Sequence, residues 1–156
     1  MNKLIMVCGL PGSGKTTLAE ELSKKLNIVC LHKDSIKENL YEILQLSTLE
    51  DSKKIGMQSV KLLLKLAEEQ LKHNIDIIIE SPFNFPDDYP FFQGWIDKYN
   101  LKLYTIICSI GNEERMRRFN KRDRHKSHYG AERGEDGVGE NDYDYKNIPG
   151  KQIRII

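Results

Sequence analysis

The sequence predicts a three-layer α/β fold in which a parallel sheet of five strands lies between layers of helices. Two features lead to this prediction. Short apolar runs, typical of strands buried on both faces, recur along the chain. Amphipathic helical segments separate these runs, and such alternation is typical of parallel strands joined by right-handed crossovers. The 156 residues show no internal repeat, and this length suits one domain covering residues 1–156.

The N-terminal half of the chain contains the first three predicted strands. Leu4–Cys8 is continuously apolar and predicts the first of them. The next segment, Thr16–Leu26, carries leucines at positions 18, 22 and 26, so we expect a helix with one apolar face. A short apolar run, two leucine-rich helical segments and a further apolar run follow. These four elements are expected at Ile28–Leu31, Ser35–Leu46, Ser52–Lys72 and Ile75–Ile79.

The C-terminal half supplies the remaining elements and one segment of different composition. Helix, strand, helix and strand are expected at Phe91–Tyr99, Leu103–Ile110, Asn112 to about Lys126, and Gln152–Ile156. Between the last two lies a segment, about 129–147, with four glycines, many acids and almost no aliphatic residues. Because it cannot bury a core, we expect a flexible loop there, either a plain surface insertion or part of a substrate flap.

Composition and charge exclude several classes of protein. The formal net charge is +1, so there is no global signal for binding to nucleic acid or to a membrane surface. The three cysteines, Cys8, Cys30 and Cys108, lie in strand-like runs, which argues against a disulfide framework and indicates a reducing compartment. No run approaches about 18 apolar residues and no signal peptide is visible, so a cytoplasmic protein without a membrane partner is expected.

The most specific motif follows the first strand directly. Its nine residues read GLPGSGKTT and fit the pattern G-x-x-x-x-G-K-[ST]. In such a loop the backbone N–H groups and the start of the next helix converge on a phosphate. We therefore expect ATP and Mg²⁺ here, with Lys15 on the β- and γ-phosphates and the Thr16 hydroxyl on the metal ion. The residues expected to contact the nucleotide are Gly9, Pro11, Gly12, Ser13, Gly14, Lys15, Thr16 and Thr17.

Two acids lie at the carboxyl ends of predicted strands, where folds of this class bind their ligands. Asp34 could cap the helix that follows it, but Ser35 and Glu38 have the spacing of a capping box, which would leave Asp34 free. We interpret Asp34 as the catalytic residue that accepts or orients the proton of an acceptor hydroxyl. Glu80 is expected to act on Mg²⁺ directly or through water. A substrate contact or a solvated acid stays open for Glu80.

Arginines are concentrated between residues 112 and 128, where a basic lid is expected. They are Arg115, Arg117, Arg118, Arg122 and Arg124. Arg118 and Arg122 are four residues apart and share one helix face, so we interpret them as catalytic residues that stabilise transition-state charge. Arg124 is expected to contact ATP. For Arg115 and Arg117 a solvated helix face explains the sequence equally well.

Two further groups carry weaker signals. His125 and His128 lack a companion carboxylate or cysteine at ligand spacing, so we expect no metal site there. Phe83 and Phe85 alternate with Asn84 close to Glu80, and they either line an acceptor pocket or belong to the core.

Taken in order, these motifs resemble the small P-loop kinases of the AAA-domain group that includes zeta toxins, polynucleotide kinases and gluconate kinases. The resemblance covers about residues 1–128 and rests on GLPGSGKTTLA, DSI, IIIES and the R-x-x-x-R of the lid. It implies a nucleoside-monophosphate-kinase-like fold that transfers the ATP γ-phosphate to a hydroxyl. It suggests Lys15 and Thr16 for phosphate and Mg²⁺, Asp34 as the acid that activates the acceptor, and Arg118, Arg122 and Arg124 as lid arginines.

The chain departs from this family in two places. The RHPGH-like element of the family reads RHKSH at residues 124–128, without the Pro-Gly pair. Relatives also continue after the last strand, so a final helix is expected to be missing here.

The leading hypothesis is an ATP-dependent kinase acting on a hydroxyl of a small metabolite. A polynucleotide 5′-hydroxyl kinase is the first alternative, because basic residues concentrate around 115–126. A non-catalytic ATP-binding regulatory module and a toxin-like kinase of nucleotide sugars are the others.

Overall fold

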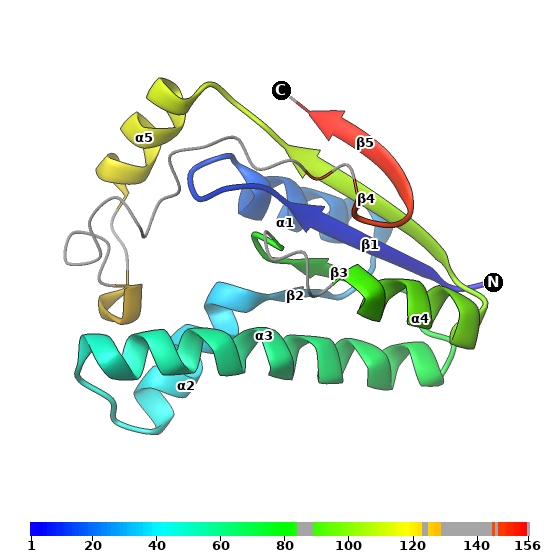
Figure 1. The fold of residues 1–156 in the computed structure, drawn as a ribbon, viewed down its shortest axis with the longest axis horizontal. Helices are drawn as coiled ribbons and strands as arrows, with labels where there is room; N and C mark the ends of the chain where they lie inside the picture. Colours follow the sequence, from blue (N-terminus) through cyan, green and yellow to red (C-terminus); the bar gives the residue numbers. More distant parts are fainter. Residues whose placement is uncertain (84–88, 123–124, 129–144, 146, 156) are drawn as a thin grey trace.

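The computed structural model describes residues 1–83, 89–122, 125–128, 145 and 147–155, which form a parallel sheet with helices on both faces (Figure 1). The strands are β1 (Lys3–Cys8), β2 (Cys30–His32), β3 (Ile77–Glu80), β4 (Lys102–Cys108) and β5 (Lys151–Ile155). Their order across the sheet is β2-β3-β1-β4-β5, and every neighbouring pair is parallel. The α/β class and the five-stranded parallel sheet are thereby confirmed.

The helices divide between the two faces of the sheet and its carboxyl end. They are α1 (Lys15–Leu26), α2 (Lys33–Ile43), α3 (Leu49–Lys72), α4 (Tyr89–Tyr99) and α5 (Asn112–Lys121). Helix α1 packs on one face, and α3 and α4 cover the other (Figure 1). Helix α2 packs along α3, while α5 lies beyond the carboxyl end of β4 (Figure 1). A short 3₁₀ turn, η2 (Lys126–His128), packs against α2 and α3.

The alternation of side chains in β1 explains why its run is apolar throughout. Leu4, Met6 and Cys8 point into the cluster under α3 and α4. Ile5 and Val7 point into the smaller cluster under α1. Successive side chains point to opposite faces of the sheet, and both faces are covered by helices. Each residue of the strand therefore has an apolar environment.

Helix α2 begins earlier than its sequence predicts. Its first residue is Lys33, so β2 passes into α2 with His32 as the N-cap. The expected capping box of Ser35 and Glu38 is therefore wrong, because both residues lie inside the helix. The Glu38 carboxylate instead binds the His128 ring, with 2.8 Å between Oε1 and Nε2.

The basic segment is also divided differently. Helix α5 ends at Lys121, where the backbone of Arg122 turns to an extended conformation, rather than continuing to about residue 126. The expected loop at about 129–147 lies mostly outside the described residues. Tyr145, inside that range, is 3% exposed, belongs to the core cluster, and donates a hydrogen bond of 2.7 Å to the Pro82 carbonyl.

Candidate functional site

The loop between β1 and α1 needs glycine at three positions. Gly9, Gly12 and Gly14 have φ angles of 147°, 83° and 88°, which residues with a side chain rarely adopt. A Cβ atom on Gly9 would lie 2.5 Å from the Cys108 carbonyl oxygen, and one on Gly12 would lie 2.6 Å from that of Arg115. The backbone of the loop is therefore pressed against β4 and α5.

The first turn of α1 is prepared for an anion. Gly14 is its N-cap and supplies no side-chain hydrogen bond, and the first turn contains no acidic residue. The unpaired N–H groups of a helix start and the positive end of its dipole favour a phosphate at this point.

Substituting Gly12 tests the packing of this loop. We expect Gly12→Ala to lower the free energy of unfolding by about 2 kcal/mol or more, because the new Cβ meets a backbone oxygen and φ is positive. Thermal melts would measure the loss. Gly94→Ala is the matched control, because a Cβ at Gly94 in α4 meets nothing within 4 Å and alanine favours a helix. Equal melting temperatures for the two variants would contradict the prediction.

Lys15, Thr16 and Glu80 come together directly beneath the loop. The Lys15 and Glu80 side chains are 7% and 3% exposed, and Lys15 Nζ lies 4.0 Å from Glu80 Oε1. The Thr16 hydroxyl lies 3.4 Å from Glu80 Oε2. Parallel pairing of β1 with β3 places Val7 opposite Glu80, so this acid ends its strand beside the strand that carries the loop.

His32 is a member of this cluster that sequence reasoning missed. Its Nδ1 atom lies 2.8 Å from Glu80 Oε2, because Glu80 and His32 are paired across β3 and β2. Hydrogen bonds with the Cys30 thiol and with the Glu80 carboxylate raise the pKa of His32 from 6.5 to about 10. The signal in the sequence was its position at the end of a strand, next to Asp34 in the segment HKDS.

The raised pKa of His32 makes stability depend on pH. Because the folded protein binds this proton more tightly than the unfolded chain, the stabilisation is fully present below about pH 6.5 and is lost as the pH rises through about 10. We expect the difference in unfolding free energy between the wild type and His32→Gln to shrink steadily over this range. Urea titrations at several pH values would measure it, with His73→Gln at an exposed position as control. A difference independent of pH would contradict the prediction.

Asp34 lies on the same side of the loop as Thr16 and Glu80. All three line one cleft, of about 640 Å³ including its open mouth, between the carboxyl ends of β2 and β3 on one side and Arg122, His125 and His128 on the other. The Asp34 side chain is 34% exposed, and its Oδ1 atom lies 3.4 Å from Lys33 Nζ. Asp34 is the second residue of α2 and not its N-cap, and it lines the cleft from the first turn of that helix.

Two of the predicted lid arginines lie close to the loop. Arg118 Nη1 would be 4.0 Å from a Cβ atom on Gly14, so its guanidinium lies over the start of α1. Arg122 lines the cleft that contains Asp34. Arg118 also shares the carboxylate of Glu114 with Arg117, and these two arginines lower the pKa of Glu114 to about 2. Arg117 is exposed, as a solvated helix face requires.

Arg115 has a structural role that the sequence did not single out. Its side chain is 2% exposed, and its Nη1 atom donates a hydrogen bond of 3.2 Å to the Pro11 carbonyl. It therefore ties α5 to the outside of the glycine loop. The spacing of four residues between Arg115 and the buried Phe119 was the available signal that Arg115 faces inward.

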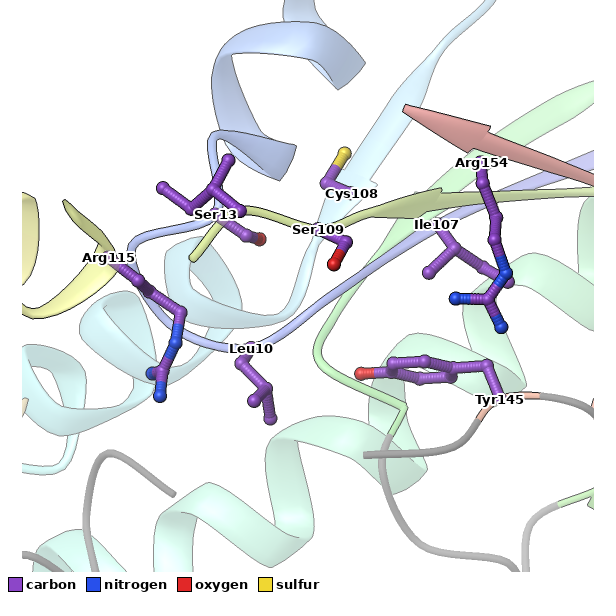
Figure 2. Close-up of a pocket in the computed structure, with 9 residues that line it drawn as sticks. Leu10, Ser13, Ile107, Cys108, Ser109, Arg115, Tyr145 and Arg154 are labelled. Atoms are coloured by element: carbon purple, nitrogen blue, oxygen red, sulfur yellow. The ribbon is translucent and has the colours of Figure 1, made fainter. Parts of the chain in front are cut away.

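Figure 2 shows a second cavity on the outer side of the loop, toward β4 and β5. Leu10, Ser13 and Arg115 border it on one side, and Tyr145 and Arg154 on the other (Figure 2). The Ser13 hydroxyl is buried, and among the described residues it has no hydrogen-bond partner.

The other predicted residues are placed as follows. Pro11 and Thr17 lie in the loop and the first turn of α1, and Arg124 and Phe85 lie outside the described residues. Phe83 is 2% exposed and packs edge-on against Phe92, so it belongs to the core and not to an acceptor pocket.

No group of three metal-binding side chains occurs among the described residues. No helix in the described part of the chain could cross a membrane.

Solved structures of the same fold include several kinases. A candidate kinase from Chloroflexus aurantiacus is 25% identical, with a TM-score of 0.86 over 99% of this chain and 87% of that one. A sugar kinase from Janibacter is 15% identical, with a TM-score of 0.63 over 99% and 85%. The APS kinase of Mycobacterium tuberculosis, solved with AMPPNP and APS, is 16% identical, with a TM-score of 0.63 over 98% and 88%. The last two likenesses establish the shared fold.

No curated protein matches the chain. The family model of the AAA domain matches residues 4–136, a range that contains the glycine loop, Asp34, Glu80 and α5. The resemblance to small P-loop kinases is thus confirmed at the level of the family. Since this match spans most of the sequence, the protein belongs to the AAA-domain family of P-loop proteins.

Proposed function

We propose that this protein is an ATP-dependent kinase that moves the γ-phosphate of ATP to a hydroxyl of a small metabolite. One observation carries the proposal: the Asp34 carboxylate opens into the same cleft as Thr16 and Glu80, beside the glycine loop. A phosphoryl acceptor in this cleft would have a proton acceptor and the phosphate-binding residues on the same side. That arrangement is what in-line transfer to a hydroxyl requires.

Each of the proposed site residues has a defined task in this mechanism. The N–H groups of the loop and the Lys15 ammonium hold the phosphates in place. Arg118, over Gly14, and Arg122, in the cleft, stabilise the negative charge that develops on the transferred group. Asp34 accepts the proton of the acceptor hydroxyl as its oxygen attacks. We also propose, from the sequence, that Arg124 contacts ATP.

The residues also fit Mg²⁺. This ion prefers oxygen ligands and commonly takes one or two from the protein, with water and phosphate supplying the rest. The Thr16 hydroxyl and the Glu80 carboxylate offer two such oxygens 3.4 Å apart at the start of α1. Bound Mg²⁺ would neutralise charge on the β- and γ-phosphates. His32 and Lys15 hold the Glu80 carboxylate in position for this task.

The proposal is tested by following the label from γ-labelled ATP with Mg²⁺. One reaction contains sugars, nucleosides and other small alcohols, and a parallel reaction contains oligonucleotides with a 5′-hydroxyl. We expect label in the small-molecule reaction. Label on the oligonucleotides instead would favour a polynucleotide kinase. Tight ATP binding without transfer to either would favour a non-catalytic module.

A further inference from the structure

The cavity on the outer side of the glycine loop contains polar groups that the proposed kinase mechanism does not use (Figure 2). Its volume is about 480 Å³ including its open mouth, and it is formed where the loop, the end of β4 and the edge strand β5 meet. It shares no described lining residue with the cleft that contains Asp34. Cavities of this size commonly hold small organic molecules.

The Ser13 hydroxyl is the first indication of a ligand in this cavity. Ser13 is 7% exposed, and among the described residues its Oγ atom has no hydrogen-bond partner. It lies 2.6 Å from the position that a Cβ atom on Gly9 would take, so the glycine leaves room for it. Figure 2 shows the hydroxyl pointing toward Ser109 and the cavity. A buried hydroxyl without a partner is costly, and a ligand that bonds to it would remove that cost.

Two further polar side chains reach the cavity from the sheet. Parallel pairing places Arg154 of β5 opposite Ile107 of β4, so both extend from the same face, as does Ser109 two residues on. Figure 2 shows the Arg154 guanidinium and the Ser109 hydroxyl on the cavity side. Among the described residues, neither side chain makes a hydrogen bond or an ion pair. A guanidinium only donates hydrogen bonds and hydroxyls can donate as well, so the fitting partner is an oxyanion.

Apolar side chains form other walls of the cavity. They are those of Leu10 and Ile107, together with the ring of Tyr145 (Figure 2). The ring is held in place, because the Tyr145 hydroxyl donates a hydrogen bond of 2.7 Å to the Pro82 carbonyl. Donors and apolar walls in one cavity suit a small molecule with an anionic end and a carbon body.

We propose that this cavity binds a small organic anion. Its carboxylate or phosphate group accepts hydrogen bonds from Arg154, Ser109 and Ser13, and its carbon body packs against the apolar walls. Because Ser13 belongs to the glycine loop, a bound anion braces this loop from the outside. The inference does not depend on the kinase function, since it uses neither Asp34 nor the cleft that contains it.

The first experiment measures the binding of three probes to the 156-residue chain by NMR titration. The probes are benzoate, phenyl phosphate and the uncharged benzyl alcohol. We expect at least one of the anions to bind about 10-fold or more tightly than the alcohol, because only the anions form charge-assisted hydrogen bonds. The tighter anion identifies the group as a carboxylate or a phosphate. Equal binding of all three probes, or no binding of either anion, would overturn the proposal.

The titration is repeated with AMPPNP and Mg²⁺ to separate this cavity from the phosphate site of the glycine loop. We expect the anion to stay bound, because the cavity lies on the outer side of the loop. An anion that AMPPNP displaces would be a ligand of the loop itself, and the proposal would be wrong.

Two variants test the donors. We expect Arg154→Gln to weaken anion binding by about 10-fold or more, because it removes the charged donor. Arg117→Gln is the matched control, because Arg117 is an exposed arginine that does not line the cavity. Equal affinities of the wild type and Arg154→Gln would contradict the proposal.

Ser13→Ala adds a measurement that does not depend on Arg154. The hydroxyl has no partner among the described residues, so we expect the melting temperature of the free variant to equal or exceed that of the wild type. The rise in melting temperature that the anion causes should become smaller. A less stable free variant would mean that the hydroxyl serves the fold, and its assignment to a ligand would fall.

Discussion

Replacing Lys15 with alanine is expected to weaken the binding of ATP with Mg²⁺ by about 100-fold or more. Hydrogen bonds to charged groups contribute about 1.5–3 kcal/mol each, and the ammonium is expected to contact two phosphates. Lys15 is the first residue of α1, and with 6% of its surface exposed it is held within the loop it serves. No neighbouring lysine of α1 can take its place, because Lys24 and Lys25 lie in the last turn of that helix.

Isothermal titration with ATP and Mg²⁺ would measure the loss, with a thermal melt of the free protein to verify that the variant is folded. Lys24→Ala is the matched control, because it removes the same charge from an exposed position of the same helix. Unchanged affinity in a folded Lys15→Ala protein would refute the assignment of the glycine loop as the phosphate site.

The glycine loop could be predicted from the sequence because its requirements are local. Three glycines at fixed spacing after an apolar strand specify the turn, and Gly9, Gly12 and Gly14 all have the positive φ that the pattern implies. The neighbourhood of Asp34 and Glu80 was predictable for a similar reason. The carboxyl ends of parallel strands meet at one edge of a sheet, and both acids lie at such ends.

Residues whose partners are distant in sequence could not be assigned in this way. The role of His32 depends on β2 lying next to β3, which sets it opposite Glu80, 48 residues away. The spacing to Phe119 indicates that Arg115 faces inward, but not what it contacts, because its partner Pro11 is 104 residues away. The order of strands in the sheet decides both contacts, and hydrophobic periodicity carries no information about that order.

The capping box illustrates how local rules compete. Ser35 and Glu38 have the right spacing, yet α2 already starts at Lys33. The reason lies in tertiary contacts: Glu38 is engaged by His128, and His32 is held by Glu80 at the end of β2. A cap is worth about 1 kcal/mol, so hydrogen bonds to charged groups on either side of it can compete with it. Asp34 still lines the cleft as part of the first turn of α2, and its proposed role rests on that position.

Replacing Asp34 with asparagine is expected to lower kcat for phosphoryl transfer by about 100-fold or more and to leave the affinity for ATP within about twofold of the wild type. The amide has the shape of the carboxylate but cannot accept the proton, and general-base catalysis contributes about 10²–10⁴-fold. Asp34 belongs to α2, whereas the glycine loop lies between β1 and α1. Replacing Asp34 should therefore leave the phosphate site intact.

Single-turnover transfer to the best acceptor among the sugars, nucleosides and other small alcohols would measure this effect, together with ATP titration of the same protein. Asp97→Asn, at an exposed position of α4, controls for the loss of one negative charge.

The pH profile separates a proton acceptor from a residue that only orients the acceptor. A base lost with Asp34 should remove the acidic limb from the wild-type profile of kcat, whereas a lost orienting contact should scale the whole profile down without changing its shape. Full activity of Asp34→Asn would show that Asp34 is not the proton acceptor and is only a polar residue in the first turn of α2.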